Sequence, residues 1–396
     1  MIRKIMLAIL SLCLMFSLAL GLGVIPNKTT KVKAATFISD GSISDPTNYD
    51  YSFAVIGDTQ CLLPSYANLK LGGIENQGAT IEWNGKTYNP VSYDGWKYFS
   101  HDTFVKIYDY VINNVDNKKI AHCFGLGDMT ERAEVWDWVQ TGCPYAPDEE
   151  FALVQEQIKR MNGVVDYSLV RGNHETLSKF DKYFGTGELA SNSGYSELVD
   201  EVYVHPDGFV DYSNTVHYFS AGELDYMVVT LDYGASDAVL NWASKKISEN
   251  PYKNVIITTH SYLTWQGNFI DNNVTNPKMD RDKLVYNRAN INNGKDMWND
   301  LISQHPNIVL AMCGHEVSED IVVRQDKGVH GNIVTSALID PQQMDIDLAS
   351  EGGVGAVAMF YLSNGGKNAE LRYYSTAKNA YLPISTPNIT LHTVDP

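Results

Sequence analysis

Short apolar runs alternate with amphipathic stretches through the first half of the chain. The runs at 53–57, 120–126 and 164–170 have strand length and end at or just before glycine or a polar residue, which is typical of buried β-strands. Between them, residues 100–115 and 149–161 repeat apolar positions every three or four residues and are predicted to be helices. The order strand, helix, strand, helix, strand predicts parallel pairing.

The second half continues this alternation and then becomes rich in strands. Residues 62–99 contain Gly, Pro and an Asn84-Gly85 hairpin signal, so we expect an insertion there. Residues 271–293 are rich in Asn and Asp and are expected to form a long loop. Further strands are predicted at 226–232, 255–259, 308–312, 321–324, 332–339, 354–361 and 369–374, and further helices at 237–248 and 294–304.

The N-terminal segment has the features of an export signal. Arg3 and Lys4 precede an apolar run that extends to about Ile25, and a small-x-small cleavage motif ends at Ala34. We therefore predict a signal peptide over 1–34, cleaved after residue 34 or 35, of a kind typical of Gram-positive bacteria. An uncleaved membrane anchor is the alternative, because the apolar run is nearly long enough to span a bilayer. In both cases the rest of the chain lies outside the cell.

The remaining sequence is consistent with one globular domain. The chain has 396 residues, 44% of them hydrophobic, which is enough for a sizeable core. No internal repeat or linker divides it. We predict a short lead-in at 35–44, a single α/β domain over 45–378 and a C-terminal tail at 379–396.

Charge narrows the range of partners. Removing residues 1–34 removes five basic residues and no acidic one, so the net charge changes from −17 to −22. Such an acidic surface repels nucleic-acid backbones and anionic lipids and attracts divalent cations. We expect no nucleic-acid partner and no stable membrane span after cleavage.

The cysteines give no sign of a disulfide framework. Cys13 is lost with the signal, and Cys61, Cys123, Cys143 and Cys313 show no CxxC spacing. Two of the four lie in apolar runs. Buried free thiols are expected, with disulfides as the alternative in an exported protein.

Side chains that can bind a metal follow five of the predicted strands. Ligand sites of open α/β sheets lie at the carboxyl ends of strands, and oxygen and nitrogen donors suit a divalent cation better than a Ser or Cys nucleophile. Glycines at 57, 127, 172 and 314 allow tight turns there. Each residue alone is a weak signal, but their joint order is not. The residues are Asp58, Gln60, Asp128, Asn173, His174, Glu175, His260 and His315.

The order Asp-x-Gln, Gly-Asp, Gly-Asn-His-Glu, His and Gly-His resembles the calcineurin-like metallophosphoesterases. The resemblance extends over residues 52–375, and the segment from Asn293 through Asp340-Pro-Gln342 to Ser375 looks like the extracellular bacterial branch. It implies a four-layer α-β-β-α sandwich of two mixed sheets flanked by helices. It also implies two divalent metal ions, such as Mn, Zn, Fe or Ca.

The resemblance implies a role for each site residue. Asp128 would bridge the two ions. His174 would not be a ligand but the general acid for the leaving group. Asn173, His260 and His315 would complete one metal site, and Asp58 and Gln60 would serve the other.

The sequence departs from the family at one ligand. The usual pattern is Gly-His-x-His, whose second His binds the same ion as Asp58, but this chain has Val317 there. Glu316 should point away from His315, because side chains alternate along an extended segment. The Asp58 site is therefore weak, completed from elsewhere, or suited to a harder metal that prefers oxygen ligands.

These features predict a hydrolase of small phosphomonoesters or phosphodiesters. A metal-bridging hydroxide would attack phosphorus, Asn173 would help to hold the phosphoryl oxygens, and His174 would protonate the leaving group. A nucleotide hydrolase is the enzymatic alternative, but a second domain for base recognition is missing. The non-enzymatic alternative is a catalytically dead scaffold that serves as a surface or carbohydrate-binding module.

Four other residues have open interpretations. Tyr262 and Trp265 could form a wall for the leaving group or pack in the core or a loop. Arg171 could bind phosphate, although a surface salt bridge is the preferred interpretation. His122, within an apolar strand, is expected to lie in the core.

Overall fold

We analysed a computed structural model of the chain. It describes residues 44–63, 101–130, 147–271, 291–318, 320–342 and 355–394, together with short strands at 30–31, 81–83 and 86–88. The predicted signal peptide otherwise lies outside these residues, although β1 (Thr30–Lys31) falls within it. Within the described ranges, no helix is long and apolar enough to cross a bilayer.

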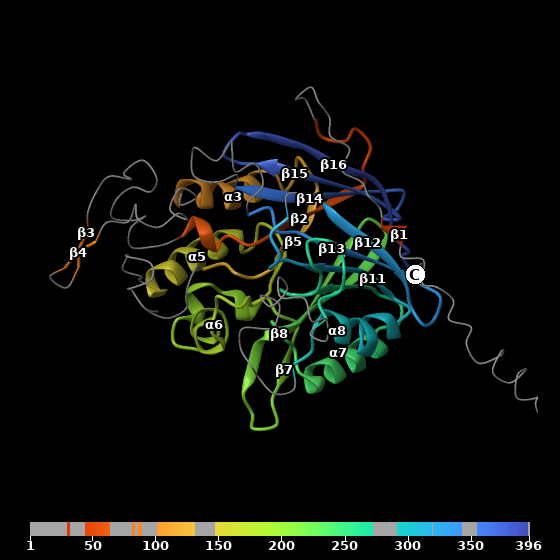
Figure 1. Ribbon diagram of the computed structural model, residues 1–396, viewed down its shortest axis with the longest axis horizontal. Helices are drawn as coiled ribbons and strands as arrows, with labels where there is room; N and C mark the ends of the chain where they lie inside the picture. The colour runs from red at the N-terminus through yellow and green to blue at the C-terminus, as the bar shows by residue number, and fades with distance from the viewer. Residues whose placement is uncertain are drawn as a thin grey trace, which may run out of the picture.

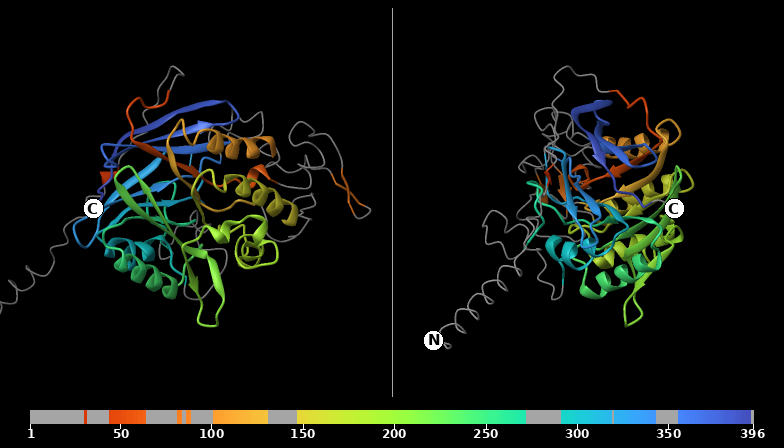
Figure 2. Two further views of the ribbon diagram at one scale, coloured as in Figure 1. Left: turned by 180° about the vertical axis from the view of Figure 1, so that it is seen from behind. Right: turned by 90° about the vertical axis from the view of Figure 1, so that its right-hand side faces the viewer.

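Two β-sheets pack face to face at the centre of the molecule (Figures 1 and 2). The larger sheet has eight strands in the order β1-β12-β13-β11-β10-β9-β8-β7. Besides β1, its strands are β7 (Glu201–Val204), β8 (Val210–Ala221), β9 (Leu224–Thr230), β10 (Asn254–Thr258), β11 (Ile308–Cys313), β12 (Val322–Lys327) and β13 (Ile333–Leu338).

The smaller sheet has six strands in the order β16-β15-β14-β2-β5-β6. They are β2 (Tyr51–Ile56), β5 (Ile120–Gly125), β6 (Tyr167–Leu169), β14 (Ala356–Ser363), β15 (Asn368–Ser375) and β16 (Ala380–Thr390). A separate hairpin joins β3 (Ile81–Trp83) to β4 (Lys86–Tyr88), as the Asn-Gly signal predicts.

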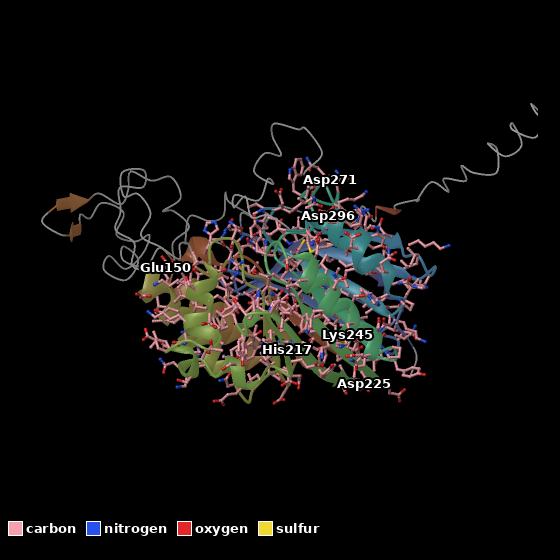
Figure 3. All side chains as sticks on the ribbon, turned by 90° about the horizontal axis from the view of Figure 1, so that it is seen from below. Glu150, His217, Asp225, Lys245, Asp271 and Asp296 are labelled. Carbon is pink, nitrogen blue, oxygen red and sulfur yellow. The ribbon has the colours of Figure 1, made fainter. Side chains whose placement is uncertain are left out.

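Helices cover the outer face of each sheet. In the part of the chain that the structure describes, three helices pack on the smaller sheet: α3 (His101–Asn113), α5 (Pro147–Met161) and α6 (Leu177–Phe184). Two pack on the larger sheet, α7 (Asp237–Glu249) and α8 (Gly294–Asp300), and α7 turns charged residues such as Lys245 to solvent (Figure 3). The result is the α-β-β-α sandwich of two mixed sheets that the sequence predicts.

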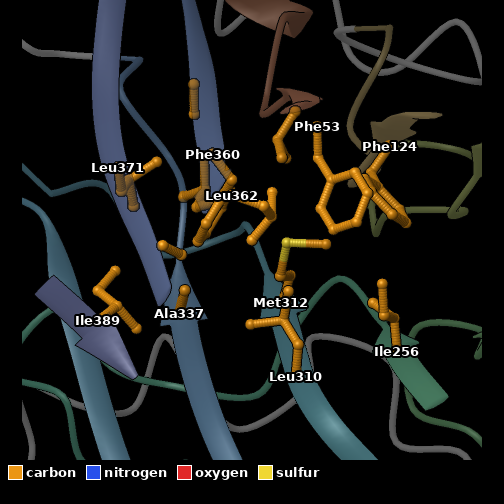
Figure 4. Close-up of a cluster of buried hydrophobic side chains, with 14 of the residues drawn as sticks. Phe53, Phe124, Ile256, Leu310, Met312, Ala337, Phe360, Leu362, Leu371 and Ile389 are labelled. Atoms are coloured by element: carbon orange, nitrogen blue, oxygen red, sulfur yellow. The ribbon is translucent and has the colours of Figure 1, made fainter. Parts of the chain in front are cut away.

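The inner core lies between the two sheets (Figure 4). Phe53 and Phe360 of the smaller sheet face Ile256, Met312 and Ala337 of the larger one, and all five are buried. All six residues of β2 are buried because its alternate side chains enter the inner core and the helix-facing core. A strand covered on both faces has no solvent-exposed side, which explains its apolar run from Phe53 to Ile56.

Parallel strands bring their carboxyl ends to one edge of each sheet. In the smaller sheet β2, β5 and β6 are parallel neighbours. In the larger sheet β9, β10, β11 and β13 are parallel neighbours. Residues that follow these seven strands are therefore placed where side chains from both sheets can meet.

Three parts of the structure differ from the sequence-based expectation. The predicted tail, 379–396, contains β16, which is an edge strand of the smaller sheet with Leu382 and Ile389 buried. Strands β7 and β8 and helix α6 had no predicted counterpart. Thr176 caps α6 by accepting a hydrogen bond from the backbone N–H of Lys179.

Cys123 and Cys313 are buried free thiols, as predicted. Cys143 and the side chain of Cys61 lie outside the described residues. His122 is buried in the core, also as predicted. Its ring stacks on Phe219 and lies 6.4 Å from the ring of His217, so this pair bridges β5 and β8 of the two sheets.

This histidine pair should make the fold sensitive to acid. Burial lowers the pKa of His122 well below 6.5 and that of His217 to about 4. The stability that each neutral imidazole contributes is complete above pH 6.5 and is lost as the pH falls towards 4, because only the unfolded chain gains the proton.

We therefore expect His122→Gln to lose less stability than the native chain in acid. Going from pH 8 to pH 5, the free energy of unfolding of the variant should fall by about 2 kcal/mol less. Urea unfolding of both proteins at both pH values measures this, and comparison at equal pH cancels the titration of all other groups. A difference that does not change with pH would contradict the assignment.

Candidate metal centre

The predicted site residues gather where the carboxyl ends of the parallel strands meet. Asp58 follows β2 and Asp128 follows β5, while Asn173 lies in the turn after β6. His260 and His315 follow β10 and β11. The smaller sheet thus supplies the carboxylates and the amide, and the larger sheet supplies the two imidazoles.

Asp128 is the centre of this group. It is 2% exposed, and its Oδ1 accepts a hydrogen bond of 2.8 Å from the backbone N–H of His174. Its Oδ2 lies 3.1 Å from Nε2 of His260 and 3.4 Å from Nε2 of Gln60. Burial alone would raise its pKa, but the neighbouring imidazoles of His260 and His174 dominate and hold the pKa well below its usual value. Asp128 is therefore an anion.

His260 presents one ring nitrogen to the site. Its Nδ1 lies 2.9 Å from the carbonyl oxygen of Leu126, which can only accept, so Nδ1 carries a proton. Nε2 then faces two oxygens, Oδ1 of Asn173 at 2.9 Å and Oδ2 of Asp128. A cation placed among these three atoms would satisfy all of them, because the carbonyl fixes the tautomer whose Nε2 can bind a metal.

His315 lies beside His260 at a ring distance of 4.9 Å. Burial and the neighbouring His260 lower its pKa to about 3, so its imidazole is neutral and able to bind a metal. One ligand atom from each of Asp128, His260 and His315 falls within 4.8 Å of the others. The backbone N–H of His315 also donates to both carboxylate oxygens of Asp58, at 3.2 Å each.

Glu175 holds the turns that carry these residues. Its carboxylate is 1% exposed and accepts from the backbone N–H groups of Gly172 (2.9 Å), Asp128 (3.1 Å) and Thr130 (2.9 Å). These bonds support the positive φ of 47° at Asp128, a conformation that non-glycine residues seldom adopt. The sequence placed Glu175 in the Gly-Asn-His-Glu run but did not indicate this positioning role.

Arg171 is not on the surface, contrary to the preferred interpretation of the sequence. It is 2% exposed and forms a two-point ion pair with Asp232, at 2.6 and 2.7 Å, and also donates to the carbonyl of Glu175. Asp232 follows β9, so this pair joins the two sheets next to the site. A guanidinium engaged in this way is not available to bind phosphate.

Tyr262 and Trp265 differ in their surroundings. Tyr262 is fully buried and its ring packs at 5.3 Å from that of Phe269, so it belongs to the core. Trp265 is 57% exposed on the same loop. Of the two, only Trp265 has a surface that a leaving group could contact.

Two buried oxygens at the Asp58 side have no hydrogen-bond partner among the described residues. They are Oε1 of Gln60 and Oδ2 of Asp340, and these residues are 6% and 1% exposed. Leaving such atoms unpaired is costly, and a bound cation removes that cost. The residues present therefore fit divalent ions on both sides of Asp128. Asp340 was in the sequence pattern but had no assigned role, since nothing local marks it as part of the site.

The chain is similar to a known protein family and to several solved structures. A family model described as calcineurin-like phosphoesterase matches residues 51–319. Among solved structures, a dimetal phosphatase from Danio rerio is similar at 12% identity and a TM-score of 0.44, covering 88% of this chain and 100% of that one. GAP50, the anchor in the inner membrane complex of Plasmodium, is similar at 10% identity and a TM-score of 0.36, covering 86% and 89%. No curated protein matches the chain.

The close approach of Gly172 to Asp128 gives a direct test of this geometry. A Cβ at position 172 would lie 2.1 Å from Oδ1 and 2.3 Å from the backbone nitrogen of Asp128. Gly172→Ala should therefore displace the carboxylate, cost about 2–4 kcal/mol of stability and abolish stabilisation by Mn²⁺. Thermal unfolding with and without Mn²⁺ measures both effects.

Gly125→Ala is the matched control, because its Cβ would lie 3.2 Å from a flexible methyl group of Leu169 and 3.5 Å, an ordinary contact distance, from the carbonyl oxygen of Ser168. It should keep a Mn²⁺-induced rise in melting temperature close to that of the native chain. An equally large rise in Gly172→Ala would show that the carboxylate position does not matter for metal binding.

Proposed function

The chain belongs to the calcineurin-like phosphoesterase family, and we propose that it uses divalent ions to hydrolyse small phosphomonoesters or phosphodiesters outside the cell. The observation that carries this proposal is the convergence on Asp128 of one amide and two imidazoles, with Asp58 and Gln60 close by. Membership of the family makes the chain a hydrolase of phosphoric esters. The substrate class, the roles of the residues and the location are proposals.

We assign the ligands to the two ions as the resemblance to the family implies. Asn173, His260 and His315 would hold one ion together with Asp128, and Asp58 and Gln60 would hold the other. When bound, the ions supply positive charge to the phosphoryl oxygens and lower the pKa of a coordinated water. The chain itself positions the ester and handles the proton of the leaving group.

His174 is placed to act on the leaving group. Its backbone N–H is tied to Asp128, and its Nε2 lies 3.8 Å from Oδ2 of that residue, while the side chain is 30% exposed. A partly exposed imidazole beside a buried carboxylate can hold a proton at Nε2 and donate it to the departing alkoxide oxygen. The neighbouring Asn173 amide can donate a hydrogen bond to a phosphoryl oxygen.

The charge of the chain favours a small substrate. The net charge of −22 that the chain has without residues 1–34 repels extended polyanions, whereas a single phosphate group is neutralised by the ions that hold it. This supports small esters over nucleic acids.

His174→Ala should reduce turnover without removing the metal. We expect a loss of about 100-fold or more in kcat for an alkyl phosphate, whose alkoxide needs a proton. The loss should be smaller for p-nitrophenyl phosphate or bis-p-nitrophenyl phosphate, because p-nitrophenolate leaves without one. Kinetics on both kinds of substrate, combined with metal analysis of the same samples, test this.

Asp128→Asn is the reference variant for that experiment and should lose both metal and activity. Metal loss in His174→Ala equal to that in Asp128→Asn would contradict the acid role. No turnover of any ester by the native chain with Mn, Zn, Fe, Ca or Mg would favour the non-enzymatic scaffold.

We also propose that the chain is exported, on the basis of the charged start, the apolar run and the cleavage motif in residues 1–34. A full-length chain produced in a Gram-positive host should be found in the medium with Ala35 or Thr36 as its first residue. Sequencing the N-terminus of the secreted protein tests this. A chain that stays in the membrane fraction with an intact N-terminus would be anchored instead.

A further inference from the structure

Asp340 follows β13 in the same way that His315 follows β11. The two strands are parallel neighbours, so their carboxyl ends lie side by side at the edge that carries the site. The segment around Asp340 also touches the turn before Asp58. A Cβ added to Gly57 would lie 2.6 Å from the carbonyl oxygen of Ile339 and 3.1 Å from the Pro341 ring. Asp340 therefore lies next to the Asp58 side of the site.

The carboxylate of Asp340 is only partly satisfied by the protein. Oδ1 accepts a hydrogen bond of 3.1 Å from the backbone N–H of Gln342, whereas Oδ2 is buried and has no partner among the described residues. The charged groups that face it are Asp58, Asp128 and His260. Two of these three are carboxylates, so the charge around Asp340 is mostly negative. An aspartate that only stabilised the fold would be expected to have a partner for both oxygens.

The Asp58 side of the site lacks a ligand. Position 317 offers no ligand because it is Val. An ion on this side would then have only three protein ligands, namely Asp58, Gln60 and Asp128. Oε1 of Gln60, two residues after Asp58, is likewise buried without a hydrogen-bond partner among the described residues. Two buried oxygens without donors and two neighbouring carboxylates form an arrangement that a divalent cation stabilises.

We propose that Asp340 is a ligand of the ion on the Asp58 side, where Val317 cannot serve. This inference rests on the proposed function, since it assumes a centre with two ions. It makes the two sides chemically different. The side with Asp58, Gln60, Asp128 and Asp340 has only oxygen ligands and suits a hard cation such as Mn²⁺, Mg²⁺ or Ca²⁺, whereas the side with two imidazoles also suits Zn²⁺.

The test is the metal stoichiometry of Asp340→Asn. Asn keeps the shape of the side chain and an oxygen that can accept from Gln342, but it removes the negative charge. Calorimetric titration of the metal-free protein with MnCl₂ should give two ions per native chain. In Asp340→Asn, binding of one ion should be unchanged, and binding of the second should weaken by at least ~10-fold.

Asp320→Asn is the matched control, because it makes the same change at an exposed carboxylate in the segment that follows His315. It should bind two ions like the native chain. Asp340→Ala, which removes the side chain, should give the same stoichiometry as Asp340→Asn, so the result does not depend on one variant.

Thermal unfolding of the same proteins separates a ligand from a structural residue. Without metal, Asp340→Asn should melt at or above the temperature of the native chain, because it removes charge repulsion from Asp58 and Asp128. With Mn²⁺ it should gain less stability than the native chain. A lower melting temperature without metal, together with a native-like gain on adding Mn²⁺, would make Asp340 structural and overturn the proposal.

Metal binding by the native chain distinguishes a failure of the Asp340 assignment from a failure of the proposed function. If it binds no divalent ion, the proposed function fails, and the ligand assignment fails with it. If the native chain and Asp340→Asn both bind two ions with equal affinity, only the assignment of Asp340 is overturned.

Discussion

The contact between Asp128 and His260 is the interaction on which the rest of the site depends. Asp128 belongs to the smaller sheet and His260 to the larger one, and both are buried. His260 also bonds to the carbonyl of Leu126, which lies next to the β5 strand that leads to Asp128. The two sheets are therefore joined at their carboxyl ends by an anion and an imidazole. The inner core brings the sheets together, and this contact determines which side chains face each other.

The same place concentrates negative charge. Asp58, Glu175 and Asp340 are buried near Asp128, and burial together with the neighbouring carboxylates raises the pKa of Asp58 and Glu175. Arg171, the buried guanidinium nearby, is engaged by Asp232. Buried carboxylates without a compensating positive charge destabilise a fold, even where they accept hydrogen bonds. Divalent ions offset this cost, so binding of metal and stability of the site are coupled in our proposal.

The local sequence pattern predicted the elements near the site well. An apolar run such as the one that starts at Phe53 is typical of a strand covered on both faces, and the amphipathic period of His101–Asn113 is typical of a helix with one buried face. Strand β16 was not predicted, because Ala380–Thr390 contains two prolines and lacks the regular alternation of polar and apolar residues that indicates a strand. Its place in the sheet depends on pairing with β15, a contact that the local pattern does not encode.

By itself, the sequence showed which residue types follow each strand and in what order. This predicts the site, because parallel strands place the residues that follow them at the same edge of the sheet, whatever the order of the strands. That was sufficient for the α/β fold and for the candidate residues from Asp58 to His315. Only the tertiary structure decided the burial of Arg171, the support from Glu175 and the position of Asp340 beside Asp58. The first and the last of these features arise from the packing of one sheet on the other, and the second arises from the pairing of β5 with β6 within the smaller sheet. Both kinds of packing set distances between side chains far apart in the chain.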